Sequence, residues 1–117
     1  MVCLFTAVSW QEDSLLTAIN AVTGVGYDLD SFMRVGERIW FLKRGMQALF
    51  GSGGEDDIMH PRFYQAVEEG PHAGSVPDFE LMKSDYYRYR ELDENGRISR
   101  GKCDALGLEF LAEKLGI

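Results

Sequence analysis

The sequence predicts an all-α fold of about five helices with one long irregular loop in the middle. Apolar residues recur at intervals of three and four, the spacing that places them on one face of a helix. Residues that start or stop helices flank most of these segments, and no segment alternates between polar and apolar residues as a half-buried strand would. A chain of 117 residues is expected to form a single helical domain, residues 1–117.

The first predicted helix follows an S-x-x-E capping box formed by Ser9 and Glu12. In such a box each side chain accepts a hydrogen bond from a backbone N–H that the helix leaves free. Four apolar residues then recur at helical spacing as far as Gly24, which stands where a glycine commonly ends a helix.

The longest predicted helix runs from about residue 29 to residue 50, with Asp28 as its N-cap. Its apolar residues form so broad a stripe that we expect the helix to be buried on most sides. Arg44 is one of its basic residues, which must find water or a carboxylate partner. For Glu37 and Arg38, in the middle of the helix, we expect ion pairs with another helix or domain.

The second half of the chain begins with a glycine-rich and acidic stretch, residues 51–57. We expect it to be a flexible surface loop, since phosphate-binding loops lie between a strand and a helix and use a nearby lysine. The chain stays irregular as far as Pro77, apart from a short helical turn over residues 61–66. Further helices are expected over approximately residues 78–92, 99–107 and 108–115.

The composition excludes several classes of partner. The formal net charge of −7 disfavours nucleic acids and anionic membrane surfaces. No apolar run reaches the roughly 20 residues that a membrane-spanning helix needs, and the N-terminal residues make a poor signal peptide. Two cysteines without a secretion signal are expected to stay reduced, so we expect a cytoplasmic protein.

The residues do not form a complete catalytic site. His60 and His72 each lie in a proline-containing loop without a second ligand at metal-binding spacing, so we interpret both as structural or solvated. The adjacent pairs Asp56–Asp57 and Glu68–Glu69 are interpreted as solvated charges, and the three tyrosines between residues 86 and 89 as core or interface residues. An independent hydrolase or zinc enzyme is therefore disfavoured, and we expect any function to depend on a larger protein.

The two cysteines differ in their surroundings. Cys103 occupies an apolar position of its predicted helix, which favours a small buried side chain. Cys3 lies in an apolar strip ahead of the first predicted helix, and taken alone it would also be interpreted as a buried thiol.

Six strings of the sequence together resemble, in order and spacing, the C-terminal end of the tungsten-containing aldehyde ferredoxin oxidoreductase family. They are AINAVTG (18–24), VGERIW (35–40), EGP (69–71), DYYRYR (85–90), DENG (93–96) and LGLEF (106–110). Each string is weak alone, but the series covers nearly the whole chain.

The resemblance implies an enzyme that oxidises an aldehyde to a carboxylic acid. The implied cofactors are tungsten, or molybdenum, held by two pterins, and a [4Fe–4S] cluster that passes electrons to ferredoxin. Four cysteine thiolates hold such a cluster, and in this family three come from the middle domain and the fourth from the C-terminal domain. The resemblance assigns that fourth ligand to Cys3 and places Leu4 beside the cofactor.

The sequence departs from the family pattern at its N-terminal end. Only Met1 and Val2 precede Cys3, so the Asp and Gly of the Asp-x-x-Gly-Leu motif that comes before the fourth cysteine in the family are missing ahead of it. The three partner cysteines and the pterin-binding domains are missing from these 117 residues as well. We therefore expect a truncated chain or a split gene product that binds no cofactor alone, works with the remaining domains of its parent enzyme, and can form homodimers through an exposed apolar face. The alternative is a stand-alone helical interaction module without a cofactor. The aldehyde is not specified by either interpretation.

Overall fold

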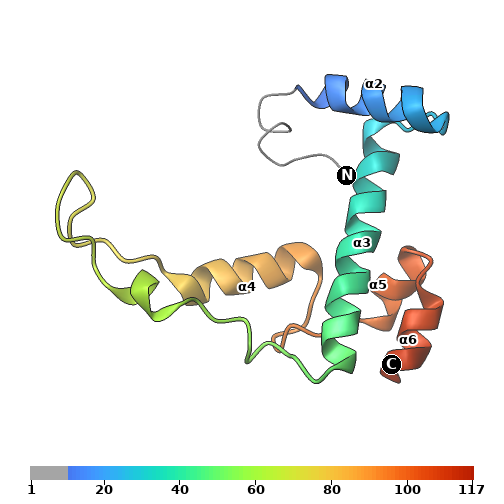
Figure 1. Ribbon diagram of the computed structural model, residues 1–117. Coiled ribbons are helices and arrows are strands. Elements are labelled where there is room, and N and C mark those ends of the chain that lie inside the picture. Colours follow the sequence, from blue (N-terminus) through green and yellow to red (C-terminus); the bar gives the residue numbers. More distant parts are fainter. Residues whose placement is uncertain (1–10) are drawn as a thin grey trace. The chain divides into compact units, whose positions relative to one another are not determined.

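The computed structural model of the protein describes residues 11–117, and within them it is entirely helical apart from loops (Figure 1). The elements are α2 (Glu12–Thr23), α3 (Leu29–Leu49), the 3-10 helix η1 (Pro61–Tyr64), α4 (Phe79–Arg90), α5 (Arg100–Ala105) and α6 (Glu109–Leu115). The described residues contain no strand, only an isolated antiparallel bridge between Leu92 and Ile98. The prediction of five α-helices and a long middle loop is confirmed.

The chain divides into two compact units, Met1–Trp40 and Phe41–Ile117, with α3 contributing residues to both. The expected single domain over residues 1–117 stays a prediction. In the described part of the first unit, α2 ends at Gly24, whose left-handed φ of 70° and N–H bond to the Asn20 carbonyl confirm the predicted cap. The predicted Ser9 cap lies outside the described residues, and α2 follows Gln11, whose side chain makes no cap bond.

The connection between α2 and α3 is held by one asparagine side chain. Asn20 donates from Nδ2 to the Tyr27 carbonyl and accepts at Oδ1 from the Tyr27 N–H, both at 2.7 Å. Asp28 then caps α3 by accepting from the Ser31 N–H at 2.8 Å, as predicted. Two local devices therefore determine where one helix ends and the next begins.

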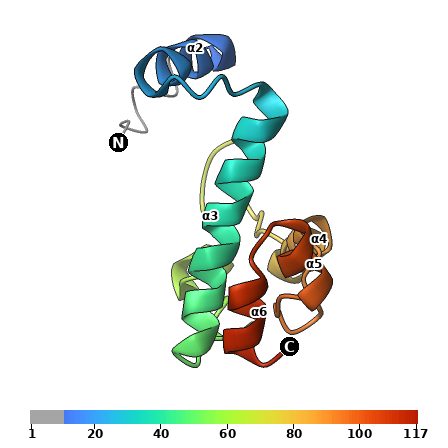
Figure 2. The same cartoon turned by 90° about the vertical axis from the view of Figure 1, so that its right-hand side faces the viewer.

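The core of the second unit gathers apolar side chains from α3, α4, α5, α6 and the turns between them. Its buried members are Phe41, Tyr87, Ile98, Cys103, Leu106, Leu108, Leu111 and Ala112. α6 lies beside the C-terminal part of α3 (Figure 2). The two helices approach closely because Gly45 has no side chain: a Cβ there would lie 2.6 Å from Cδ1 of Leu111.

The long helix α3 is less buried than its sequence predicts. Its buried residues are Phe41, Arg44 and Gly45, whereas Ile39, Met46 and Leu49 are each half exposed or more. The prediction of burial on most sides is therefore wrong for the described chain, because the short helices α5 and α6 cover only part of a broad apolar stripe. No helix within residues 11–117 is both long and apolar enough to cross a lipid bilayer.

Candidate functional site

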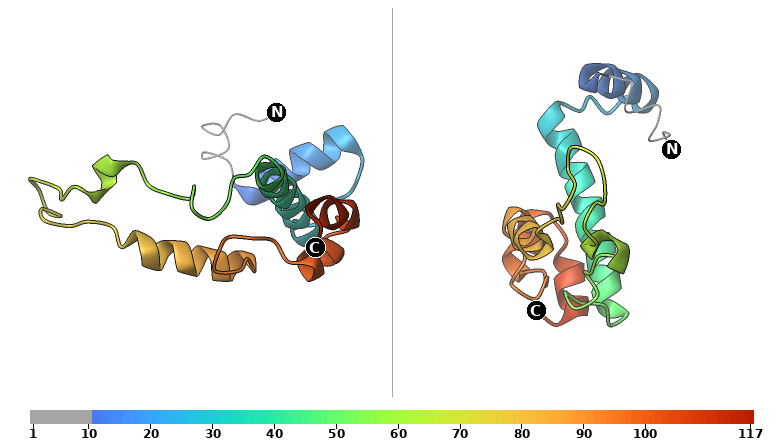
Figure 3. Two further views of the ribbon diagram at one scale, coloured as in Figure 1. Left: turned by 90° about the horizontal axis from the view of Figure 1, so that it is seen from below. Right: turned by 90° about the vertical axis from the view of Figure 1, so that its left-hand side faces the viewer.

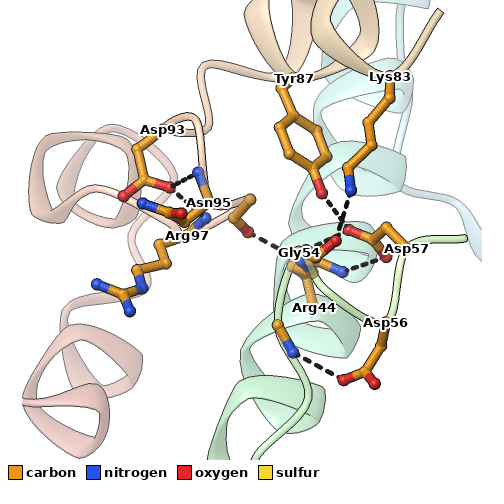
Figure 4. Close-up of polar contacts among 11 residues, drawn as sticks. Arg44, Gly54, Asp56, Asp57, Lys83, Tyr87, Asp93, Asn95 and Arg97 are labelled. Carbon is orange, nitrogen blue, oxygen red and sulfur yellow. Dashed lines mark hydrogen bonds and ion pairs between the residues drawn. The ribbon is translucent and has the colours of Figure 1, made fainter. Parts of the chain in front are cut away.

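The main polar site of the described chain is built around Arg44 (Figure 4). We call it the Arg44 cluster and define it as the side chains of Arg44, Asp57, Lys83 and Tyr87 with the backbone of residues 54 and 96. Arg44 comes from α3 and Asp57 from the loop that follows, whereas Lys83 and Tyr87 lie one turn apart on α4. The cluster thus joins segments that are far apart in the sequence.

The guanidinium of Arg44 is bound through all three of its nitrogens. Its Nη1 donates to Oδ1 of Asp57 at 2.9 Å and its Nη2 to Oδ2 at 2.6 Å, which makes a bidentate ion pair. Its Nε donates to the Gly96 carbonyl at 3.1 Å. The Tyr87 hydroxyl donates to Oδ2 of Asp57. The buried charge of Arg44 is therefore compensated, which burial requires.

Two glycines make room for this arrangement. The Gly54 N–H donates to the Asn95 carbonyl at 3.0 Å, and Lys83 Nζ donates to the Gly54 carbonyl at 2.5 Å. A Cβ at Gly54 would lie 2.5 Å from the Asn95 oxygen, and one at Gly96 would collide with Nη2 of Arg44. Gly96 also has a φ of +70°, which side-chain-bearing residues rarely adopt.

The contacts within the cluster shift the pKa values of Tyr87, Asp57 and Arg44 away from neutral pH. Burial, followed by the bond to Asp57, raises the pKa of Tyr87 to about 12. Burial alone would raise the pKa of Asp57, but the hydrogen bonds from Arg44 and Tyr87 outweigh it and lower that pKa. The bond to Asp57 raises the pKa of Arg44. At neutral pH Asp57 and Arg44 are therefore ionised and Tyr87 is neutral, so the cluster is suited to holding structure and not to proton transfer.

The cluster corrects the prediction for residues 51–57. The sequence predicts a flexible surface loop with solvated acids, but Gly54 is buried and Asp57 is bound by Arg44 and Tyr87. Asp56 is exposed and accepts from the Gly53 N–H at 3.1 Å, so it supports the turn. The predicted need of Arg44 for a carboxylate was the signal in the sequence, but nothing local identified Asp57 as the partner.

The other candidate residues lie apart from the cluster. Cys3 and Leu4, the predicted cofactor residues, lie outside the described residues. Cys103 is fully buried, as predicted, and burial, helped by Asp104, raises the pKa of its thiol. His60 accepts from the Arg62 N–H at the start of η1, which agrees with a structural role. Residues 11–117 contain no group of three His, Cys, Asp or Glu side chains that could hold a metal ion.

A pocket of about 290 Å³ lies beside the cluster. Arg44, Gly53 and Gly96 form one part of its wall, and Ile98, Leu115 and Ile117 are among the apolar lining residues. None of its lining residues is a histidine or cysteine. With Glu55 as its one carboxylate side chain, this lining does not provide a set of metal ligands.

Comparison with known proteins places this chain in a family. Residues 1–108 match the model of a family described as "Aldehyde ferredoxin oxidoreductase, domains 2 & 3". The chain belongs to the aldehyde ferredoxin oxidoreductase family. The resemblance found in the sequence is thereby confirmed, and the Arg44 cluster lies within the matched residues.

Two curated relatives of the aldehyde ferredoxin oxidoreductase family show how much of an enzyme this chain represents. The protein from Thermococcus kodakarensis is 34% identical over 112 residues, which cover 93% of this chain and 18% of the relative. The protein from Pyrococcus horikoshii is 33% identical over 114 residues, covering 92% and 18%. Both are named tungsten-containing aldehyde ferredoxin oxidoreductase. This chain therefore spans about a fifth of their length, and no solved structure matches it.

Proposed function

We propose that this chain is the C-terminal part of an aldehyde ferredoxin oxidoreductase, where it supplies one ligand of a [4Fe–4S] cluster and a helical scaffold. The observation that carries the proposal is the family match over residues 1–108 in a chain that spans only 18% of its relatives' length. The enzyme would oxidise an aldehyde to a carboxylic acid, and this chain alone would be inactive.

The cysteines of the chain fit one cluster ligand but not a complete cluster. A [4Fe–4S] cluster needs four cysteine thiolates, and the chain has only Cys3 and Cys103. Cys103 is fully buried, and its raised pKa disfavours the thiolate that would bind iron. Cys3 is thus our proposed ligand, with Leu4 beside the cofactor, and the other three thiolates must come from the remaining domains.

The bound cofactors would supply the redox chemistry, with tungsten or molybdenum pterin acting on the aldehyde and the cluster passing electrons to ferredoxin. The role of this chain is to position the Cys3 thiolate and to cover part of the cofactor-bearing domains. Because cysteine thiols stay reduced in the cytoplasm, the proposed ligand role of Cys3 leads us to propose a cytoplasmic enzyme.

The test uses the part of the enzyme from the same source that matches the remaining length of the family, produced as a separate polypeptide, which we call the complementary polypeptide. The two are produced together without oxygen, and iron content, visible absorbance and aldehyde oxidation are measured. We expect the complex to hold a [4Fe–4S] cluster and to be active, and the chain alone to be colourless.

Cys3→Ala should remove the cluster and the activity from the complex. Cys103→Ala is the matched control, because it removes the other thiol and should leave the iron content unchanged. A stoichiometric cluster in the chain alone would contradict the proposal. Failure of the complementary polypeptide to bind this chain would favour the alternative, a stand-alone helical interaction module.

A further inference from the structure

Residues 58–78 form a projection that we call the arm. It leaves the core of the second unit after Asp57, passes through η1 and returns into α4 (Figures 1 and 3). Every residue from 60 to 78 is exposed. An ordered stretch of this length without buried residues is uncommon in compact domains and is usually functional.

The arm has a defined shape that it maintains by local contacts. Near its tip the Val67 N–H donates to the Ser75 carbonyl at 3.3 Å, and the Gly74 N–H donates to the Val67 carbonyl at 2.8 Å. Nearer its base, the rings of Tyr64 and Phe79 meet edge to face with centroids 6.3 Å apart. The outgoing and returning limbs therefore support each other.

The base of the arm is attached to the core by the Arg44 cluster. Asp57, directly before the arm, is bound by Arg44 and Tyr87. Lys83, one turn into α4, donates to the Gly54 carbonyl. The two ends of the arm are thus fixed relative to each other, and the arm is presented from a rigid base.

The arm carries several exposed apolar side chains. Its large apolar members, each exposed by 45% or more, are Ile58, Phe63, Tyr64, Val67 and Val76. Holding such a segment in one conformation costs about 1–2 kcal/mol per residue in backbone entropy. The local contacts offset part of this cost, and apolar groups on a projection stabilise it further when another surface covers them; exposed apolar patches often mark interaction sites.

The charges of the arm indicate the chemistry of that surface. Glu68, Glu69 and Asp78 are exposed carboxylates, whereas Arg62 is its one residue with a permanent positive charge. A surface that complements the arm would therefore be apolar with a basic rim.

We propose that the arm is the docking element by which this chain holds the remaining domains of its enzyme, inserting Phe63 and its apolar neighbours into an apolar, basic-rimmed groove on them. This inference rests on the proposed function. The chain spans only 18% of its relatives' length, so most of the enzyme surface that could cover the arm belongs to the complementary polypeptide.

The test measures binding of the full chain to the complementary polypeptide by calorimetry. Phe63→Ser should raise the dissociation constant at least about tenfold, the effect of losing one buried aromatic anchor. Val76→Ser should raise the dissociation constant about fivefold. Val22→Ser is the matched control for Val76→Ser, since it replaces a valine by serine in α2, at a residue that is 88% exposed. Its dissociation constant should stay within about twofold of wild type.

Three further measurements separate docking from folding and from self-association. The arm variants should keep the wild-type melting temperature, because they alter exposed residues, and arm amides of the wild-type chain should exchange more slowly in the complex. A complex that forms with its cluster and activity while Phe63→Ser binds as tightly as wild type would overturn the docking role but leave the proposed function intact. Absence of any complex would overturn both. If sedimentation shows that this chain forms a dimer and that Phe63→Ser abolishes the dimer, the arm binds a second copy of this chain instead of the remaining domains.

Discussion

At the scale of single residues, Asp57 is the countercharge of the Arg44 cluster. It accepts two bonds from Arg44 and one from Tyr87, so its removal leaves a guanidinium side chain that is only 10% exposed without its countercharge. Asp57 itself is 34% exposed, and water therefore reduces the loss compared with a fully buried pair.

We expect Asp57→Asn to lower the free energy of unfolding by about 2 kcal/mol, measured by urea denaturation. Its neighbour supplies the control, since Asp56 is exposed and accepts a bond from one backbone N–H. Asp56→Asn should cost less than about 1 kcal/mol. Equal effects of the two changes would contradict the structural role of the Arg44 cluster.

The pKa values of the cluster predict how stability depends on pH. The folded pKa of Asp57 is lowered, so its contribution is present above its unfolded value of about 4 and is lost as pH falls below it. The folded pKa of Tyr87 is raised to about 12, so its contribution is complete below about pH 10 and is lost as pH rises toward 12.

Tyr87→Phe should therefore make the decline in stability between about pH 10 and pH 12 shallower. At neutral pH it should cost about 1 kcal/mol, because Asp57 loses one donor. Tyr89→Phe removes a hydroxyl from a tyrosine that is 77% exposed, and it should leave the alkaline decline unchanged. Denaturation curves at several pH values check both expectations, and parallel curves for wild type and Tyr87→Phe would refute the first.

At the scale of elements, the packing of α3 against α6 depends on one missing side chain. Gly45→Ala would place a Cβ 2.6 Å from Cδ1 of Leu111, so that the leucine or the helix must shift. We expect a loss of about 1–3 kcal/mol in the free energy of unfolding. Gly36 lies in the same helix, and a Cβ added there would have no neighbouring atom within 4 Å, so Gly36→Ala should instead raise helix stability by up to about 1 kcal/mol. Circular dichroism melts of the two variants should shift in opposite directions.

The ends of the helices could be predicted from the sequence because their causes are local. Asp78 caps α4 by accepting from the Leu81 N–H, and Ser99 caps α5 by accepting from the Lys102 N–H, each only three residues away. The turn at residues 93–96 is likewise closed by Asp93, which accepts from the Asn95 N–H. Such signals lie within one turn of chain and can be recognised without tertiary structure.

The Arg44 cluster could not be predicted in the same way. Its bonds join residues that are far apart in the sequence. Arg44 and Asp57 are 13 positions apart, Asp57 and Tyr87 are 30 apart, and Arg44 and Gly96 are 52 apart. The exposure of α3 could not be predicted either. A broad apolar stripe indicates that a helix packs against other apolar surfaces, but it does not tell whether those surfaces lie in this part of the chain.

At the scale of the whole molecule, the buried thiol of Cys103 reports on global unfolding. It is fully buried in the core of the second unit, and its raised pKa leaves little reactive thiolate. In a Cys3→Ala background, alkylation should therefore be at least about a hundredfold slower in the native protein than in urea. Adding Asp57→Asn should accelerate native labelling about thirtyfold, in line with its loss of stability. Rapid labelling of the native chain would show that the core around Cys103 opens locally.

The fixed base of the arm has a consequence for how its length can vary. Asp57 and Tyr87 close a loop whose ends are 30 residues apart. The entropy lost in closing a flexible loop grows only with the logarithm of its length, so doubling it costs roughly 0.6 kcal/mol. Residues inserted at the tip should thus leave the free energy of unfolding nearly unchanged. Insertions among the glycines and charged residues at the base should instead destabilise the fold. The arm is a region in which insertions and deletions could alter what the chain binds without altering whether it folds.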